Sequence, residues 1–397
     1  MLLPQDALKY GKEENLIRAI AAYAGARAAE IGAENVFNFS IGNPNVPAPA
    51  IVTDTLREIL DTVPPAVLHA YTAAPGLYDV RKAIAENLNG KFGTAYGAED
   101  LYITAGSSAA LAMAMKGLLL PGDEVIVFAP YYPEYTVYAE CFGGVPVILK
   151  CREPDFQIDI ARLEAAVTER TKIVIVNSPA NPAGSIFSAE TIAAMAELLR
   201  RKQAECGHPI YILADEPYRE LVYDAETVVP FVPNFYDNTI LCYSFSKCLS
   251  LPGERMGYFL VPPRVTDSRD VYAALCGAGR ILGYINNPSL FQYMLPACLD
   301  ATADLSVYRR NRELLLTNLT AFGYEMVKPE GAFYLFLKSP EPDAAAFCER
   351  AKRFEVILVP GDCFGYPGYA RLSYCVATET VERALPALKA LAESYQG

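Results

Sequence analysis

Residues 239–261 read TILCYSFSKCLSLPGERMGYFLV, and this stretch decides much of the fold. The runs TILCY (239–243) and GYFLV (257–261) are short and apolar, as expected for strands that a sheet buries on both faces. Lys247 and Arg255 stand between them, in a segment rich in Ser, Gly and Pro that is typical of a turn. The stretch therefore predicts two buried strands whose connection carries polar side chains.

Similar apolar runs recur along the chain with helical stretches between several of them. They are EVIVF (124–128), VPVIL (145–149), KIVIV (172–176) and IYILA (210–214). Helical patterns cover 77–92, 107–120 and 188–203, and Ser188 can cap the last of these. We therefore predict an α/β fold with a mostly parallel, helix-covered sheet.

The pattern changes after residue 290. A long helix candidate from Leu290 to Leu319 precedes shorter strand-like runs and a final helix from Thr378. The runs are GAFYLFLK (331–338), VILVP (356–360) and ARLSYC (370–375). We predict a large domain over 46–290 and a smaller α+β domain over 291–397, with 1–45 as an N-terminal arm and part of the small domain.

Composition excludes several classes of protein. The 397 residues suffice for two domains, and a formal net charge of −12 without a long basic run argues against nucleic-acid binding. Ten cysteines without a Cys-X-X-Cys pair, and only two histidines, predict reduced thiols and no zinc site. No apolar run reaches the roughly 18 residues of a membrane span, and the N-terminus lacks a signal-peptide pattern. We expect a cytoplasmic protein with a small-molecule partner and no membrane contact.

Lys247 is the candidate nucleophile. Burial lowers the pKa of a lysine, and the free amine attacks a carbonyl to form a Schiff base. A lysine at a strand end is more often a surface residue than a catalytic one. Here the neighbouring motifs favour the catalytic interpretation.

Asp215 ends the run IYILA and is followed by Glu216, Pro217 and Tyr218. A carboxylate at the carboxyl end of a parallel strand lies where ligands bind, and it can keep a heteroaromatic nitrogen protonated, as pyridoxal phosphate requires. Tyr218 can donate to the phenolate oxygen of the same ring. A polar strand exit that starts a turn is an equally good account of these residues alone.

A phosphate cradle is predicted at Gly106, Ser107 and Ser108, between the run LYIT and a helix start. Backbone N–H groups at a helix N-terminus attract anions, although an ordinary capped helix has the same pattern. Further donors nearby favour the phosphate interpretation; these are Ser244, Ser246 and Arg255.

Three more residues complete the candidate site. Tyr132 in APYYPEY can stack on a pyridine ring, since the chain has no Trp, or can serve core packing. Asn181 in NSPANPAG can bond a ring oxygen and a substrate carboxylate, or can simply form a turn. Arg371 can hold an α-carboxylate through two parallel hydrogen bonds, or can form a surface salt bridge.

Taken in order, these residues and Tyr71 resemble the class I/II aminotransferases of pyridoxal-phosphate fold type I, from about Phe39 to the C-terminus. The motifs that carry the resemblance are S-x-S-K with an arginine eight residues later, N-P-x-G and D-E-P-Y. The resemblance implies the cofactor pyridoxal 5′-phosphate, amino acid and 2-oxo acid substrates, and a homodimer with shared active sites. It also implies that Gly42 lines the substrate pocket, that Tyr71 reaches the partner subunit's phosphate, and that Ala129-Pro130 and Asn181-Pro182 are cis.

The implied reaction is a ping-pong amino transfer through a Lys247 Schiff base, with Asp215 and Tyr218 as catalytic partners. A C–S β-lyase, and a decarboxylase or racemase, use nearly the same residues. A regulator with an aminotransferase-like domain requires an added DNA-binding domain, and no basic helix-turn-helix precedes residue 39.

The substrate side chain leaves two interpretations open. Arg280 precedes an N-N-P segment resembling the region from which a partner subunit supplies an arginine for dicarboxylates, although its register differs slightly. In the first interpretation it pairs with aspartate or glutamate. In the second, Tyr-rich and apolar surroundings favour neutral or aromatic donors; the residues concerned are Tyr23, Ile41, Tyr132 and Tyr284.

Overall fold

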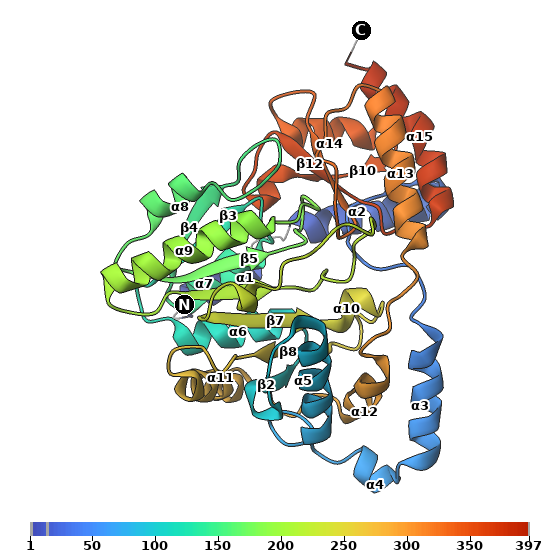
Figure 1. Ribbon diagram of the computed structural model, residues 1–397. Coiled ribbons are helices and arrows are strands. Elements are labelled where there is room, and N and C mark those ends of the chain that lie inside the picture. The colour runs from blue at the N-terminus through green and yellow to red at the C-terminus, as the bar shows by residue number, and fades with distance from the viewer. Residues whose placement is uncertain (1–2, 13–15, 396–397) are drawn as a thin grey trace.

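A computed structural model describes residues 3–12 and 16–395, and it has the predicted α/β architecture (Figure 1). Within these residues, seven strands form a central sheet whose order is β2 (Leu101–Thr104), β8 (Gly257–Leu260), β7 (Thr239–Ser244), β6 (Tyr211–Asp215), β5 (Thr171–Asn177), β3 (Glu124–Ala129) and β4 (Val145–Lys150). Of these seven strands, β8 alone runs in the direction opposite to the other six. The prediction of a mostly parallel sheet is therefore confirmed.

The central strands are apolar throughout because both of their faces are covered. Along β5, Ile173 and Ile175 join the core beneath α6 and α11, whereas Val174 and Val176 join the core covered by α9. The side chains of a strand alternate between faces, so a continuous apolar run supplies two cores at once. The helices of this part of the chain are α5 (Tyr78–Phe92), α6 (Ser107–Leu118), α7 (Glu134–Cys141), α8 (Ile160–Ala166), α9 (Ala189–Cys206), α10 (Phe245–Cys248) and α11 (Ser268–Leu282).

The predicted helix over 290–319 is wrong, because two helices occupy this range: α12 (Ser289–Cys298) and α13 (Ser306–Ala321). Pro296 weakens α12 since it has no N–H for the helical ladder. Asp304 then accepts a hydrogen bond from the backbone N–H of Ser306, 2.9 Å away, where α13 begins.

The C-terminal part forms a smaller α+β unit around a sheet of β11 (Val359–Pro360), β12 (Tyr369–Ser373) and β9 (Tyr334–Lys338). The helices α13, α14 (Ala344–Lys352) and α15 (Thr378–Glu393) gather beside it (Figure 1). The run VILVP was expected to be one strand. It is two, because β10 (Val356–Ile357) pairs with β1 (Phe37–Asn38) and β11 pairs with β12.

The N-terminal residues reach both parts of the molecule. α1 (Gln5–Lys12) contacts α7 through a 2.5 Å hydrogen bond from Tyr10 to Glu140, and α2 (Leu16–Ile31) contacts the small unit through Arg27 and Glu355, 2.6 Å apart. Next along the chain, α3 (Ala50–Thr62) and α4 (Pro65–Leu68) form an arm that packs on α12 (Figure 1). The predicted domain boundaries at 45 and 290 stay predictions. Each helix of the described residues is too short or too polar to cross a membrane.

Candidate active site

A cleft of about 320 Å³ opens at the carboxyl ends of the central strands, where ligands bind in open α/β sheets. It brings together most of the residues that the sequence singled out; these are Gly42, Ser107, Ser108, Tyr132, Asn181, Asp215, Tyr218, Ser244, Ser246, Lys247, Arg255 and Arg371. Gly106 lies directly behind the lining residues. Tyr71 and Arg280 lie outside the cleft of their own chain, and 92% of Tyr71 is exposed.

Lys247 stands in the short helix α10, directly after β7. Its Nζ donates to the backbone carbonyl of Gly42 at 2.8 Å. The pKa of Lys247 is lowered to about 8, chiefly by burial; Cys375 opposes this shift, and the positive charges of Arg255 and Arg371 add to it. Near neutral pH the amine is therefore far easier to deprotonate than that of an ordinary lysine.

Asp215 ends β6 and is buried. Its Oδ2 accepts a 2.5 Å hydrogen bond from the Tyr135 hydroxyl, whereas its Oδ1 is buried without a partner. The pKa of Asp215 is raised to about 6, chiefly by burial and to a smaller extent by the negative charge of Glu216, although Tyr135 and Ser107 act in the opposite direction. A buried acceptor without a donor is costly, and a protonated ring nitrogen would supply the missing donor and charge. The carboxylate thus fits the pyridine nitrogen of pyridoxal phosphate.

The residues predicted to form a phosphate cradle lie at the start of α6 and around it. Gly106 has a φ of 81°, and a Cβ atom there would lie 2.7 Å from Nη2 of Arg255. Arg255 donates to Ser246 Oγ at 3.3 Å and to the Ala105 carbonyl at 3.1 Å. The N-terminus of α6, a guanidinium and serine hydroxyls therefore converge on one small space, which suits a phosphate.

Arg371 lies on the opposite side of the cleft, in β12, and is almost fully buried. It donates to Asn181 Oδ1 at 3.0 Å and to the Ser40 carbonyl at 2.6 Å, and its Nε has no partner. The rings of Tyr334 and Phe364 lie 4.8 and 4.7 Å from its guanidinium carbon. A buried guanidinium with a free donor, held between two rings, is suited to bind a carboxylate.

Several residues that line this cleft were not predicted from the sequence. Tyr135 follows Tyr132 by three positions at the start of α7, and its ring meets that of Tyr132 edge-on at 5.5 Å. The repeated tyrosines of the stretch APYYPEY (129–135) are the signal that could have identified it. Ile17 and Tyr334 come from distant segments that have no local motif, and nothing in their surroundings along the chain could have placed them here.

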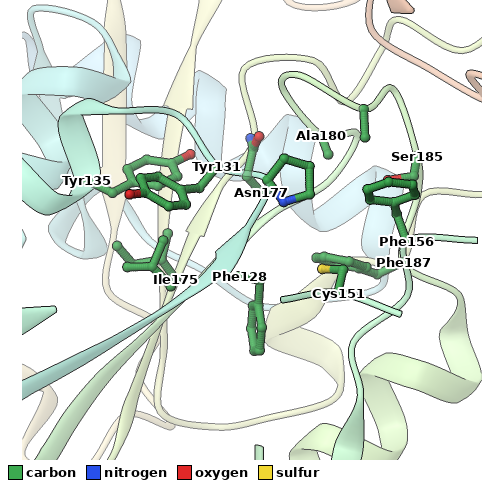
Figure 2. A pocket seen from close by; sticks show the side chains of 13 residues that line it. Phe128, Tyr131, Tyr135, Cys151, Phe156, Ile175, Asn177, Ala180, Ser185 and Phe187 are labelled. Carbon is green, nitrogen blue, oxygen red and sulfur yellow. The ribbon is translucent and has the colours of Figure 1, made fainter. Parts of the chain in front are cut away.

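A much smaller pocket of about 20 Å³ lies behind the cleft and shares Tyr135 and Asn177 with it. Figure 2 shows Tyr131, Tyr135 and Asn177 at one end of this pocket and Cys151, Phe156 and Phe187 at the other. It has room for about one water molecule. The larger cleft is thus the one that can hold a cofactor.

Comparison with known protein families supports this interpretation of the cleft. The model of the family described as "Aminotransferase class I and II" matches residues 34–388. The chain belongs to this family. Its members depend on pyridoxal phosphate and have fold type I, so the predicted fold, cofactor and enzyme class are confirmed.

Individual relatives are aminotransferases as well. Aspartate aminotransferase of Thermotoga maritima is 30% identical over 91% of this chain and 93% of its own. A crystal structure of an aminotransferase from Eubacterium rectale has a TM-score of 0.97 and 47% identity, with both chains fully covered. Aspartate aminotransferase of Thermus thermophilus, solved with maleate, has a TM-score of 0.84 and 27% identity over 98% of this chain and all of its own.

Three local predictions near the site are confirmed. Ala129-Pro130 and Asn181-Pro182 are both cis, as the resemblance implied. Ser188 caps α9 by accepting from the backbone N–H of Thr191. The aminotransferase family also argues against a lyase or a regulator as the main function of this chain.

Proposed function

We propose that this aminotransferase moves the amino group of an L-amino acid to a 2-oxo acid in two half-reactions at the cleft, through a Schiff base of Lys247. The observation that carries this proposal is the placement of three groups around one space. They are the buried amine of Lys247, the unpartnered carboxylate oxygen of Asp215 and the free donor of Arg371. Bound there, pyridoxal phosphate supplies an electron sink for the pair that remains when the Cα proton leaves.

The residues of the chain divide the remaining work. Arg371 and Asn181 hold the α-carboxylate and thereby orient the Cα–H bond. With the cofactor bound, Lys247 would take the Cα proton of the substrate as a general base, which its lowered pKa permits. Asp215 would keep the ring nitrogen protonated, and Tyr218 would donate to the ring oxygen. The cradle at Gly106, Ser107, Ser108, Ser244, Ser246 and Arg255 holds the phosphate, and Tyr132 covers the ring.

For the substrates, aspartate and 2-oxoglutarate are our proposed pair, because the relatives include aspartate aminotransferases. In this proposal Arg280 of the partner subunit meets the side-chain carboxylate. A second class, neutral or aromatic donors, is favoured by Ile17 and Ile41, which line the cleft and offer apolar contact.

The same proposal includes a homodimer in which Tyr71 completes the phosphate site of the partner subunit. Tyr71 is exposed, and the backbone of the next residue, Thr72, accepts a hydrogen bond from Asn286. Apolar residues close to Asn286 in sequence are exposed too; they are Ile281 (71%), Tyr284 (37%) and Ile285 (43%). A second copy covering this face would bury them and bring Tyr71 to its site.

Mixing inactive Lys247→Ala and Tyr71→Ala chains tests this arrangement. Mixed dimers have one site with both substitutions and one site with neither, so activity should rise above that of both parents. Confirmed subunit exchange without a rise would contradict the role of Tyr71 across the interface.

We also propose that the enzyme works in the cytoplasm, which localisation of a tagged full chain can check.

Reduction with borohydride tests the central step. Purified protein should show a visible absorption band that disappears on reduction. The reduced cofactor should then remain attached, as a label, to the peptide that contains Lys247. Lys247→Ala should still bind pyridoxal phosphate through Asp215 and the phosphate donors but should be inactive. Normal transamination by this variant would refute the assignment.

A further inference from the structure

Tyr334, the first residue of β9, is buried between the two sides of the cleft. Its hydroxyl lies 2.8 Å from the hydroxyl of Tyr218, and its ring lies 4.8 Å from the guanidinium carbon of Arg371. A Cβ atom on Gly42 would come within 2.1 Å of the Tyr334 hydroxyl oxygen, so the glycine leaves exactly the room that this hydroxyl needs. One side chain thus touches both the proposed cofactor donor and the proposed carboxylate receptor.

The sheet register fixes this position. Tyr334 pairs with Ser373 across the antiparallel strands β9 and β12, and Arg371 lies two residues before Ser373. Residues in such a diagonal relation lie on one face of a sheet and are within reach of long side chains. The ring of Tyr218 also meets the ring of Tyr334 edge-on, at 5.7 Å. Backbone pairing and ring packing therefore hold Tyr334 against both neighbours.

The direction of the bond between the two phenols follows from proton counting. Tyr218 has one hydroxyl proton, and our proposed function assigns it to the ring oxygen of the cofactor. The bond to Tyr334 must then be donated by Tyr334 and accepted by Tyr218. A hydrogen bond accepted by a hydroxyl makes that hydroxyl a stronger donor.

We propose that Tyr334 is a positioning residue with two separable tasks, and this proposal rests on the proposed function. Its hydroxyl strengthens the hydrogen bond that Tyr218 makes to the cofactor. Its ring keeps the plane of the Arg371 guanidinium oriented toward the substrate carboxylate.

Two substitutions separate these tasks in the holoenzyme. Tyr334→Phe removes only the hydroxyl, so the ring oxygen of the cofactor is less well stabilised as an anion and the bound cofactor keeps its proton to higher pH. The midpoint of the visible absorbance change should rise by about 0.5–1 pH unit, while KM for the amino donor stays within about threefold. Tyr334→Leu should cause the same rise and also increase KM about tenfold, because the Arg371 plane loses its support.

Tyr374→Phe is a matched control. Tyr374 is a fully buried tyrosine that follows β12 directly, and its hydroxyl donates to the Ala332 carbonyl at 3.3 Å. Loss of this hydroxyl should leave the absorbance midpoint unchanged. A double-mutant cycle adds a second readout: in a Tyr218→Phe background, Tyr334→Phe should cause no further shift.

An absorbance midpoint in Tyr334→Phe equal to that of wild type would overturn the role of the hydroxyl, and so would additive shifts in the cycle. Tyr334→Leu with wild-type KM would overturn the role of the ring. In each of these cases the visible band and the borohydride label on Lys247 would persist, so the proposed function would stand. Absence of the band and of the label from wild type would contradict the proposed function itself.

Discussion

The side chains below the cleft stand at the carboxyl ends of strands in one sheet, whereas those above it come from opposite ends of the chain. We call the first group the floor: Ser107, Tyr132, Asp215 and Lys247, which follow or end β2, β3, β6 and β7. We call the second group the roof: Gly42, Tyr334 and Arg371. The floor lies on the large sheet, and the roof belongs to the small unit and the segment beside it (Figure 1).

The two groups also differ in what holds them. Floor residues are fixed by a sheet that is buried on both faces, so their positions depend on one cooperative core. Tyr334 and Arg371 of the roof are fixed by a separate small sheet, and the roof meets the large sheet's side of the cleft through specific bonds, such as those from Arg371 to Asn181 and from Lys247 to the Gly42 carbonyl. The difference teaches that the floor sets which cofactor chemistry is possible, whereas the roof sets how a substrate is held against it.

The largest expected effect concerns the floor. Asp215→Asn keeps the shape of the side chain but removes the negative charge that would keep the ring nitrogen protonated. We expect kcat to fall by about 100-fold or more, as when other electrostatic stabilisers are removed from active sites. Steady-state kinetics with saturating pyridoxal phosphate measures this loss. A fall of less than threefold would show that the floor does not need the charge.

The same substitution should not destabilise the cofactor-free protein. The pKa of Asp215 is about 6 in the folded state, above its usual 3.8, so the ionised carboxylate costs stability above pH 6 and nothing below pH 4. The cost is at most about 3 kcal/mol. Thermal unfolding at pH 8 should give Asp215→Asn a Tm at least equal to that of wild type, and any gain should vanish toward pH 4.

A smaller effect is expected in the roof. Arg371→Lys keeps the charge but loses the planar fork, so KM for every amino donor should rise by about 10- to 150-fold, the equivalent of one charge-assisted hydrogen bond. The value of kcat should change less than KM. Arg312→Lys is a control. Arg312 is as buried as Arg371, but it does not line the cleft, and its guanidinium forms an ion pair with Asp224 at 2.8 Å. If both variants altered KM alike, a general loss of packing would explain the result.

Floor and roof were not equally predictable from the sequence. Asp215 directly follows an apolar run, and Lys247 and Asn181 follow within five residues of one; the geometry of parallel strands places such residues at one edge of the sheet. Arg371 could be chosen only for its carboxylate-binding chemistry and the family resemblance. Tyr334 was missed because its role depends on the register of β9 against β12, which no local pattern encodes. The helix predicted over 290–319 failed for a related reason, since the apolar periodicity continues across a break at Pro296 and Asp304.

The smallest expected effect sharpens the question of what the roof selects. Arg280 is exposed and lies outside the cleft of its own chain. It could therefore contact a substrate only in the cleft of a partner subunit. A guanidinium that stays partly hydrated contributes near the lower end of the range for charge-assisted bonds, and we expect Arg280→Ala to reduce kcat/KM for aspartate by about tenfold. Alanine and phenylalanine have no side-chain carboxylate and should be unaffected. The measurement is kcat/KM for the three donors in wild type and variant, with 2-oxoglutarate as acceptor. An unchanged ranking would remove Arg280 from the site and assign the space beside Ile17 and Ile41 to neutral or aromatic side chains, because an apolar wall favours them over a second carboxylate.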